Sequence, residues 1–318
     1  MMTTPPTKVR RPLRAAILAA MLPVLAAPGC TGKQADTPTS GQASVAVCEE
    51  VLPLIREEEA RFEELYPGAS VDLRPRPARE AIAELFNDSV KMIVSARALN
   101  GGERAAQKAL HVEVTEFRIA MDALAVIVNE ANDVTRLTLT QLDSIFTGGV
   151  MDWGLLGWRG SAGKISVFLP DRNMAAYEVF ASRVLGGRAY TTAAGIVTSS
   201  PGMIAAVEKE ASAVGIVGLN WLRNTTARIR ILELMDPAAP DSLEIGGKYF
   251  SPHQAYIYKQ FYPLARNVYI YSTPDSYGVS SGFTSFITSA AGQKIVQSQG
   301  LVPATMPVRL VELRNNGI

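Results

Sequence analysis

The sequence contains very few of the side chains that hold metals or form disulfide frameworks. Its 318 residues include two cysteines, Cys30 and Cys48, and two histidines, His111 and His253. Neither histidine has ligand-type residues at a metal-binding spacing around it, and two cysteines cannot crosslink a small scaffold several times. We therefore expect no metal site and no cofactor. A single Cys30–Cys48 bridge is an alternative to two separate cysteines.

A cluster of positive charge is also lacking outside the first residues. The chain carries 31 Lys and Arg residues against 30 Asp and Glu residues, a formal net charge of +1. Residues 1–29 hold four basic residues and no acidic one, so the remainder has 27 basic and 30 acidic residues. A mildly acidic body without a basic patch does not suit the phosphate backbone of nucleic acid. We expect no nucleic-acid partner.

No apolar run is long and unbroken enough to be a comfortable membrane-spanning helix, but a shorter run lies near the N-terminus. Residues 13–30 are LRAAILAAMLPVLAAPGC, and basic residues precede them. A basic start, a short apolar centre and small residues at its end are typical of an export signal. The chain is therefore expected to leave the cytoplasm.

The end of this run resembles a bacterial lipobox, in which the signal is removed before a cysteine that then carries lipid. We predict a signal over residues 1–29, lipid attachment at Cys30, and a flexible tether over residues 30–43, which are small, polar and rich in Pro, Gly and Ser. The protein would then be anchored outside a bacterial membrane, on its periplasmic or cell-surface side. An ordinary export signal with a chance cysteine is the alternative, and it predicts a protein secreted to the periplasm.

Strand-like and helix-like segments alternate along the body of the chain. Predicted strands cover residues 44–48, 70–73, 92–95, 112–119, 123–128, 165–168, 195–198 and 214–217, and predicted helices cover residues 51–66, 79–86, 139–146, 173–185, 201–210 and 282–299. Repeated β-α-β order predicts a parallel sheet covered by helices. Because the pattern forms two series, we predict two lobes with a cleft between them. A single large α/β domain is the alternative.

Several segments resemble the phosphate-specific substrate-binding proteins of bacterial ABC transporters, the PstS-like family. The clearest is DALAVIVNEANDVTRLTLTQLDSIFTGGVMDW at residues 122–153, and the others are residues 62–73, 211–222, 262–271 and 282–309. The resemblance implies a class II periplasmic-binding-protein fold. In that fold, two α/β lobes are joined by hinge strands, and a solute is held in the cleft between them.

The resemblance also implies where the lobes begin and end. Lobe 1 is expected over residues 44–118 and 264–318, and lobe 2 over residues 122–250. Hinge strands are expected near residues 115–122 and 251–263. A protein of this family closes around an anion and delivers it to a membrane permease without making or breaking a bond.

The loops that hold phosphate in the family are altered here. The first loop has Cys48-Glu49-Glu50 where the family has Ser or Thr, and the second has Arg79 where the family has Ser. Lys91 stands at the family's Asp and Leu169 at its Arg. The candidate ligand-binding residues that the resemblance implies are Glu49, Glu50, Arg79, Ser95, Arg97, Asp171, Arg172 and Asn173.

Each candidate also has a structural interpretation. Arg97 could anchor the end of its strand, and Asp171 or Asn173 could be the N-cap of the following helix. Glu49 and Glu50 would be favourable at a helix N-terminus whether or not they touch a ligand. An anion site would survive if Arg79, Arg172 and helix N-termini converge on the cleft while Glu49 and Glu50 turn away from it.

The leading hypothesis is a lipid-anchored, monomeric solute-binding subunit of an ABC importer for phosphate or a related oxyanion. The alternative is an envelope-anchored sensor or protein-interaction module with a degenerate pocket on the same fold. Carboxylates such as Glu49, Glu50 and Asp171 could flank a cleft as a hydrolytic pair does. Without a histidine in a cleft-forming loop or a Gly-x-Ser-x-Gly elbow, we do not expect an enzyme.

Overall fold

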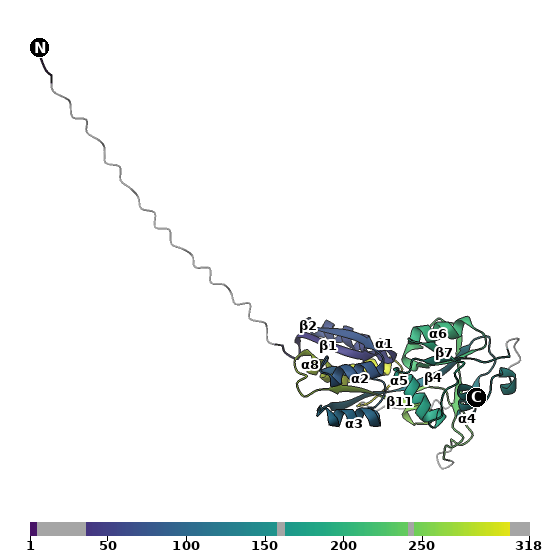
Figure 1. Ribbon diagram of the computed structural model, residues 1–318. Coiled ribbons are helices and arrows are strands. Elements are labelled where there is room, and N and C mark those ends of the chain that lie inside the picture. Colours follow the sequence, from purple (N-terminus) through teal and green to yellow (C-terminus); the bar gives the residue numbers. More distant parts are fainter. Residues whose placement is uncertain (5–35, 158–162, 241–244, 306–318) are drawn as a thin grey trace, which may run out of the picture. The chain divides into compact units, whose positions relative to one another are not determined.

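The computed structural model describes residues 1–4, 36–157, 163–240 and 245–305 (Figure 1). Residues 5–29 of the predicted signal, Cys30 and the first part of the predicted tether lie outside the described residues, as do residues 306–318 at the end of the predicted first lobe. Among the residues described, no helix combines the length and apolar character needed to cross a bilayer.

Helices and strands alternate along the described chain. The helices are α1 (Leu52–Leu65), α2 (Ala78–Phe86), α3 (Gly101–Ala109), α4 (Leu139–Thr147), α5 (Ala175–Phe180), α6 (Ser200–Lys209), α7 (Gln254–Tyr258), α8 (Val279–Thr288) and α9 (Ala290–Ser298). Short helical turns are η1 (Glu49–Val51), η2 (Trp153–Leu156), η3 (Ala181–Leu185) and η4 (Leu219–Trp221). The strands are β1 (Ser40–Cys48), β2 (Gly68–Arg76), β3 (Met92–Ser95), β4 (Thr115–Asn129), β5 (Arg136–Thr138), β6 (Ser166–Pro170), β7 (Gly195–Val197), β8 (Ala213–Gly218), β9 (Ile229–Ile231), β10 (Glu233–Met235), β11 (Ala265–Ser272) and β12 (Val302–Pro303).

The main sheet joins two parallel halves through an antiparallel middle. Its order is β2-β1-β3-β11-β4-β8-β6-β7, and β9 and β12 also pair with β4. Strands β2, β1 and β3 are parallel in one half, and β6, β7 and β8 are parallel in the other. The antiparallel strands β11 and β4 connect them. The chain thus has the two-lobe α/β fold that the sequence predicts.

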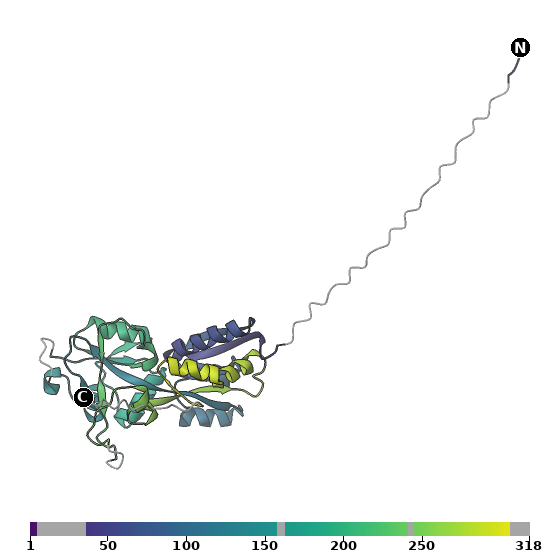
Figure 2. The same ribbon diagram turned by 180° about the vertical axis from the view of Figure 1, so that it is seen from behind.

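Each half has its own apolar core. One core packs α1, α8 and α9 against β1 and includes Leu54, Phe62 and Phe283, and the other packs α4 and α5 against β4 and β6 and includes Phe146 and Trp153. The C-terminal helices, coloured yellow-green and yellow, therefore cover the half that begins the chain (Figure 2). Segments far apart in sequence build one lobe together.

Strand β4 differs from the prediction of two strands at 112–119 and 123–128. It is one continuous strand, in which Thr115–Ala123 face β11 and Leu124–Val128 face β8. Asp122, the polar residue between the two apolar runs, does not break the strand because Arg266 pairs with it. One strand therefore crosses from one lobe to the other.

Three other boundaries differ from the prediction. Ser40–Ala43, placed in the flexible tether, are the start of β1, because their backbone pairs in parallel register with β2. The predicted helix over residues 282–299 is two helices, since Ser289 caps the second one. Helix α3 was not predicted, because two glycines begin it and it buries no residue; a capping box of Asn100 and Glu103 defines its start.

Candidate oxyanion site between the lobes

Glu50 lies where the two lobes meet, and its side chain points into the contact. The residue is 1% exposed. Its carboxylate accepts hydrogen bonds from the backbone N–H groups of Ala175 and Ala176, at 2.9 and 2.6 Å. It also accepts from the Arg266 guanidinium at 3.1 Å and from the Cys48 thiol at 3.0 Å. Four donors from both lobes thus converge on one carboxylate.

The folding reason for this contact lies at the start of α5. The helix follows the carboxyl end of β6, its N-cap is Met174, and the Met174 side chain makes no capping hydrogen bond. The first N–H groups of a helix have no partner within the helix and attract an anion. Glu50 supplies that partner from the other lobe. The interpretation of Asp171 or Asn173 as the N-cap is therefore wrong.

Arg266 and Asp122 form a buried ion pair beside Glu50. Nε and Nη2 of Arg266 donate to Oδ2 of Asp122 at 2.9 and 2.8 Å, and both side chains are almost fully buried. Burial raises the pKa of Asp122, although the guanidinium opposes that shift. Burial and the neighbouring Glu50 raise the pKa of the Cys48 thiol, so Cys48 is a neutral donor.

Glu49 points toward the start of a second helix. Its carboxylate accepts hydrogen bonds from the backbone N–H of Ser200 at 3.1 Å and from the Ser200 hydroxyl at 2.8 Å, where α6 begins. Burial raises the pKa of Glu49, and the hydrogen bonds from Ser200 act in the opposite direction. Neighbouring residues of one loop therefore reach two different helix starts of the other lobe.

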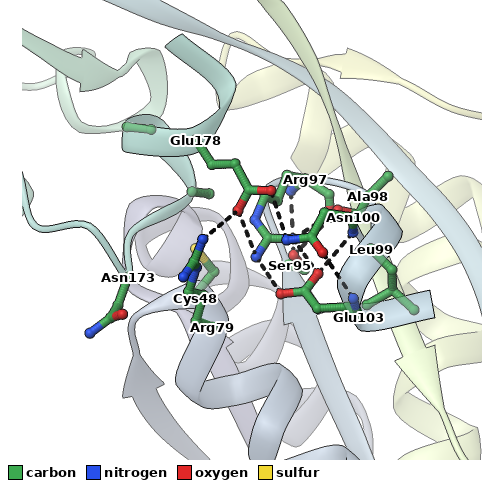
Figure 3. Close-up of polar contacts among 12 residues, drawn as sticks. Cys48, Arg79, Ser95, Arg97, Ala98, Leu99, Asn100, Glu103, Asn173 and Glu178 are labelled. Carbon is green, nitrogen blue, oxygen red and sulfur yellow. Dashed lines mark hydrogen bonds and ion pairs between the residues drawn. The ribbon is translucent and has the colours of Figure 1, made fainter. Parts of the chain in front are cut away.

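Arg97 belongs to a separate polar network at the side of the interlobe contact (Figure 3). Its guanidinium donates two hydrogen bonds to Glu103, at 2.7 and 2.6 Å, and lies 3.2 Å from Glu178 of α5. Asn100 donates to the same Glu178 at 2.8 Å, and Arg79 lies 3.8 Å from it. Burial acts to raise the pKa of Glu103, but the hydrogen bonds from Arg97 lower it. Figure 3 shows Glu178 reaching between the two arginines.

The other candidates make short-range hydrogen bonds or a backbone bond between the lobes. The Ser95 hydroxyl donates to the Arg97 carbonyl at 2.8 Å, and Asp171 accepts from the backbone N–H of Asn173 at 2.9 Å. The Asn173 carbonyl accepts from the backbone N–H of Arg79 at 3.1 Å. Arg172 is exposed. Arg79 and Arg172 thus do not converge on the cleft, and Glu49 and Glu50 point into the interlobe contact rather than away from it.

Sequence reasoning did not select Arg266, Asp122 or Ser200 as site residues. Arg266 is a single cation at the start of the aromatic and apolar strand 265–272, and Asp122 is a single acid between two apolar runs. The available signal was two isolated opposite charges, Asp122 in one expected hinge strand and Arg266 just after the other expected hinge. Ser200 could have been found as a hydroxyl at a helix start.

Little space is left beside the Glu50 carboxylate. The cavity lined by Glu50, Met174, Ala176, Ser200 and Gly218 has a volume of about 10 Å³. A single water needs roughly 10–15 Å³ measured in this way. A Cβ atom on Gly218 would lie 2.8 Å from Nη2 of Arg266, so this position is closely packed as well. In this conformation, the chain itself fills the space around the Glu50 carboxylate.

Metal ligation offers no alternative for this cluster of acids. Across residues 1–4, 36–157, 163–240 and 245–305, no three His, Cys, Asp or Glu side chains are grouped so that they could hold a metal ion. The donors around Glu50 are N–H and S–H groups, which suit an anion and repel a cation.

Comparison with known proteins identifies the fold family. The model of the PBP superfamily domain matches residues 32–291. The chain belongs to the PBP superfamily. Among its relatives, the phosphate-binding protein PstS of Pseudomonas aeruginosa PAO1 is 23% identical over 266 residues, which are 79% of each chain. PstS of Staphylococcus aureus USA300 is 21% identical over 291 residues, which are 90% of this chain and 86% of the relative.

Solved structures of the same PBP superfamily agree in fold. A Clostridium perfringens phosphate ABC transporter substrate-binding protein with bound phosphate has a TM-score of 0.71 at 20% identity, covering 83% of this chain and 99% of that one. An ABC-type phosphate transport receptor from Vibrio cholerae has a TM-score of 0.63 at 21% identity, covering 83% and 100%. The chain is a PstS-like member of the superfamily.

Proposed function

We propose that this protein is an extracytoplasmic solute-binding protein of an ABC importer, and that it holds phosphate or a related oxyanion between its lobes. The observation that carries the proposal is the donor set around Glu50. It comprises the buried guanidinium of Arg266 and the backbone N–H groups of Ala175 and Ala176. Aimed N–H groups and a buried guanidinium are the groups that bind a desolvated oxyanion.

The names of the relatives support the same function. The Pseudomonas and Staphylococcus proteins are phosphate-binding proteins, and the Vibrio structure is a phosphate transport receptor. In this proposal the protein delivers its solute to a permease and catalyses no reaction. We further propose that residues 1–29 direct export, that lipid on Cys30 anchors the protein to the outer side of a membrane, and that the protein works as a monomer. The boundaries predicted for lobes and hinges are part of this proposal.

Phosphate titration of the chain without its first 29 residues tests the proposal. We expect a rise in the midpoint of thermal unfolding and a measurable heat of binding at about millimolar phosphate, because a ligand that binds only the folded state stabilises it. Chloride at equal ionic strength is the control. If neither heat nor a thermal shift appears at about 10 mM phosphate, sulfate or arsenate, the oxyanion proposal is wrong.

The filled contact favours a second candidate. Since Glu50 already uses the donors and the cavity beside it is about 10 Å³, the same fold could be an envelope-anchored sensor or protein-interaction module. This candidate predicts a folded protein that no oxyanion stabilises and that binds another envelope protein through its surface. Crosslinking in intact cells separates the two functions, because the importer subunit must crosslink to a permease.

A further inference from the structure

We propose that Glu50 is the protein's own ligand: its carboxylate occupies the oxyanion position between the lobes, holds them closed without solute, and must leave before a solute anion can bind. This inference rests on the proposed function, because it assigns the residue that controls access to that site. It makes Glu50 the residue that determines which anions bind and how tightly.

The first argument is the match of donors. A carboxylate and a phosphate both accept charge-assisted hydrogen bonds from N–H groups and guanidinium. Glu50 receives two backbone N–H bonds, one guanidinium bond and one thiol bond, all in a buried setting. An anion from solution would need these same donors. Glu50 and such an anion therefore compete for them.

The second argument is that the lobes contact each other beyond the Glu50 cluster. The lobes also meet through the backbone N–H of Leu54, which donates to the Asn220 side chain at 2.9 Å, and through the indole N–H of Trp221, which donates to the Glu49 carbonyl at 3.1 Å. Glu178 adds the contacts to Asn100 and Arg97. These contacts add hydrogen bonds between the lobes, although Nδ2 of Asn220 and Oδ1 of Asp122 have no hydrogen-bond partner among the described residues.

The third argument is charge. Glu50 and Asp122 place two carboxyl groups on one guanidinium, that of Arg266, and Glu49, which is bonded to Ser200, is near enough to feel a minor electrostatic effect of the same guanidinium. Adding a doubly charged phosphate beside the carboxyl groups of Glu50 and Asp122 would bring acidic groups together in a buried place, which is strongly unfavourable. The cavity of about 10 Å³ also cannot hold it. Phosphate and the Glu50 carboxylate therefore exclude each other.

The fourth argument is that Glu50 is attached to the chain. A tethered group competes at an effective concentration of roughly millimolar or more, whatever the solute concentration outside. A weakly bound anion is therefore kept out, and only an anion that gains more from the donors than Glu50 does can enter. Glu50 raises the threshold for binding.

Substitution of Glu50 tests this assignment, with Glu64→Gln as the matched control because Glu64 is an exposed acid of the following helix. Glu50→Ala frees both the donors and the space. We expect phosphate to bind Glu50→Ala at least about tenfold more tightly than the unsubstituted protein, measured by titration calorimetry. Acetate or formate at tens of millimolar should raise the unfolding midpoint of Glu50→Ala by restoring the missing carboxylate, and should leave the unsubstituted protein and Glu64→Gln unchanged.

Hydrogen exchange gives a readout that does not need a solute. In Glu50→Gln, which keeps the side-chain shape, we expect the amides of Ala175 and Ala176 to exchange at least about tenfold faster than in the unsubstituted protein. The amide of Gln141, which the Thr138 side chain caps at the start of α4, should not change. If Glu50→Ala does not fold, this comparison still decides the assignment.

The outcomes separate this inference from the proposed function. Faster exchange and rescue by acetate without any phosphate binding would keep Glu50 as the internal ligand and refute phosphate as the solute. Equal phosphate affinity in the unsubstituted protein and Glu50→Ala, with unchanged exchange at Ala175 and Ala176, would overturn the inference and leave the proposed function standing.

Discussion

Two buried carboxylates near the start of the chain have opposite surroundings. Glu50 lies at the contact between the lobes, and Glu58 lies inside α1. Glu50 is 1% exposed and receives four hydrogen bonds. Glu58 is 0% exposed, and neither of its carboxylate oxygens has a hydrogen-bond partner among the described residues. Burial, with a smaller effect from Glu57, raises the pKa of Glu58 to about 9.

The difference shows that burial alone does not decide what an acid does in a fold. An ionised carboxylate is tolerated inside a protein where donors replace its water, and it becomes a neutral acid where they do not. Glu49 lies between these cases, because it is half-buried and receives two bonds from Ser200. By the number of hydrogen bonds that each carboxylate receives, the order is Glu50, Glu49 and Glu58. Changing the donors or the acid tests this order.

Removal of the cation beside Glu50 should have the largest effect. In Arg266→Met, Glu50 and Asp122 lose the guanidinium that compensates them, and leaving buried charges unpaired costs about 3–5 kcal/mol. We expect the free energy of unfolding in urea to fall by that amount. Arg104→Met, which breaks only an exposed pair with Glu116, should lose less than about 1 kcal/mol. Equal losses would contradict the central role of Arg266.

Replacement of the acid without donors should stabilise the protein. Because the folded-state pKa of Glu58 is about 9 and the ordinary value is 4.5, the folded chain keeps a proton that the unfolded chain releases. The free energy of unfolding of the natural protein should therefore fall as pH rises between these values. Glu58→Met lacks this dependence, so we expect it to be more stable by about 2 kcal/mol at pH 8.

The pH series supplies the control for that prediction. The two proteins should differ least near pH 5 and most near pH 9, as measured by urea unfolding at several pH values. Glu64→Met, in which an exposed acid of the same helix is replaced, should follow the natural protein at every pH. A constant difference between Glu58→Met and the natural protein would show that packing, and not protonation, explains the gain.

Loss of one donor from the intermediate acid should have the smallest effect. Ser200→Ala removes the hydroxyl bond to Glu49 and keeps the backbone N–H bond, so we expect a loss of about 1 kcal/mol in chemical unfolding. Ser285→Ala removes an exposed hydroxyl that bonds only within its own helix, and it should change stability by less than about 0.5 kcal/mol. If Ser200→Ala loses no more free energy of unfolding than Ser285→Ala, the hydroxyl bond to Glu49 does not stabilise the fold. Glu49 would then not lie between Glu50 and Glu58.

The sequence was sufficient for the scaffold because the scaffold follows local rules. Strands at residues 92–95 and helices such as 139–146 show their buried faces in the spacing of apolar residues, and Gly148 ends the latter helix in a left-handed conformation. Resemblance to the PstS-like family supplied the order of the two lobes. The predicted element boundaries were wrong at two single polar residues, Asp122 and Ser289. The cation that pairs with Asp122 lies in a distant segment, and Ser289 caps the second of two helices that the apolar spacing predicts as one.

The site could not be predicted in the same way because its contacts join distant positions. Glu50 meets Ala175 across 125 positions and Arg266 across 216 positions of sequence. The residues Cys48-Glu49-Glu50 do not reveal whether the two acids point into the contact or into solvent. The direction of the two acids depends on the N–H groups at the starts of α5 and α6. These groups come to lie opposite the acids only when the lobes assemble.

The unbroken strand β4 has a consequence for how fast a solute could enter. Because β4 extends through both lobes and pairs with β11 along half its length, separating the lobes requires these strands to bend. The register shift between Val268 and Tyr269 of β11 is a place where such bending can concentrate. The stiffness of a two-stranded ribbon would then set the rate of opening, independently of the affinity that the buried side chains set.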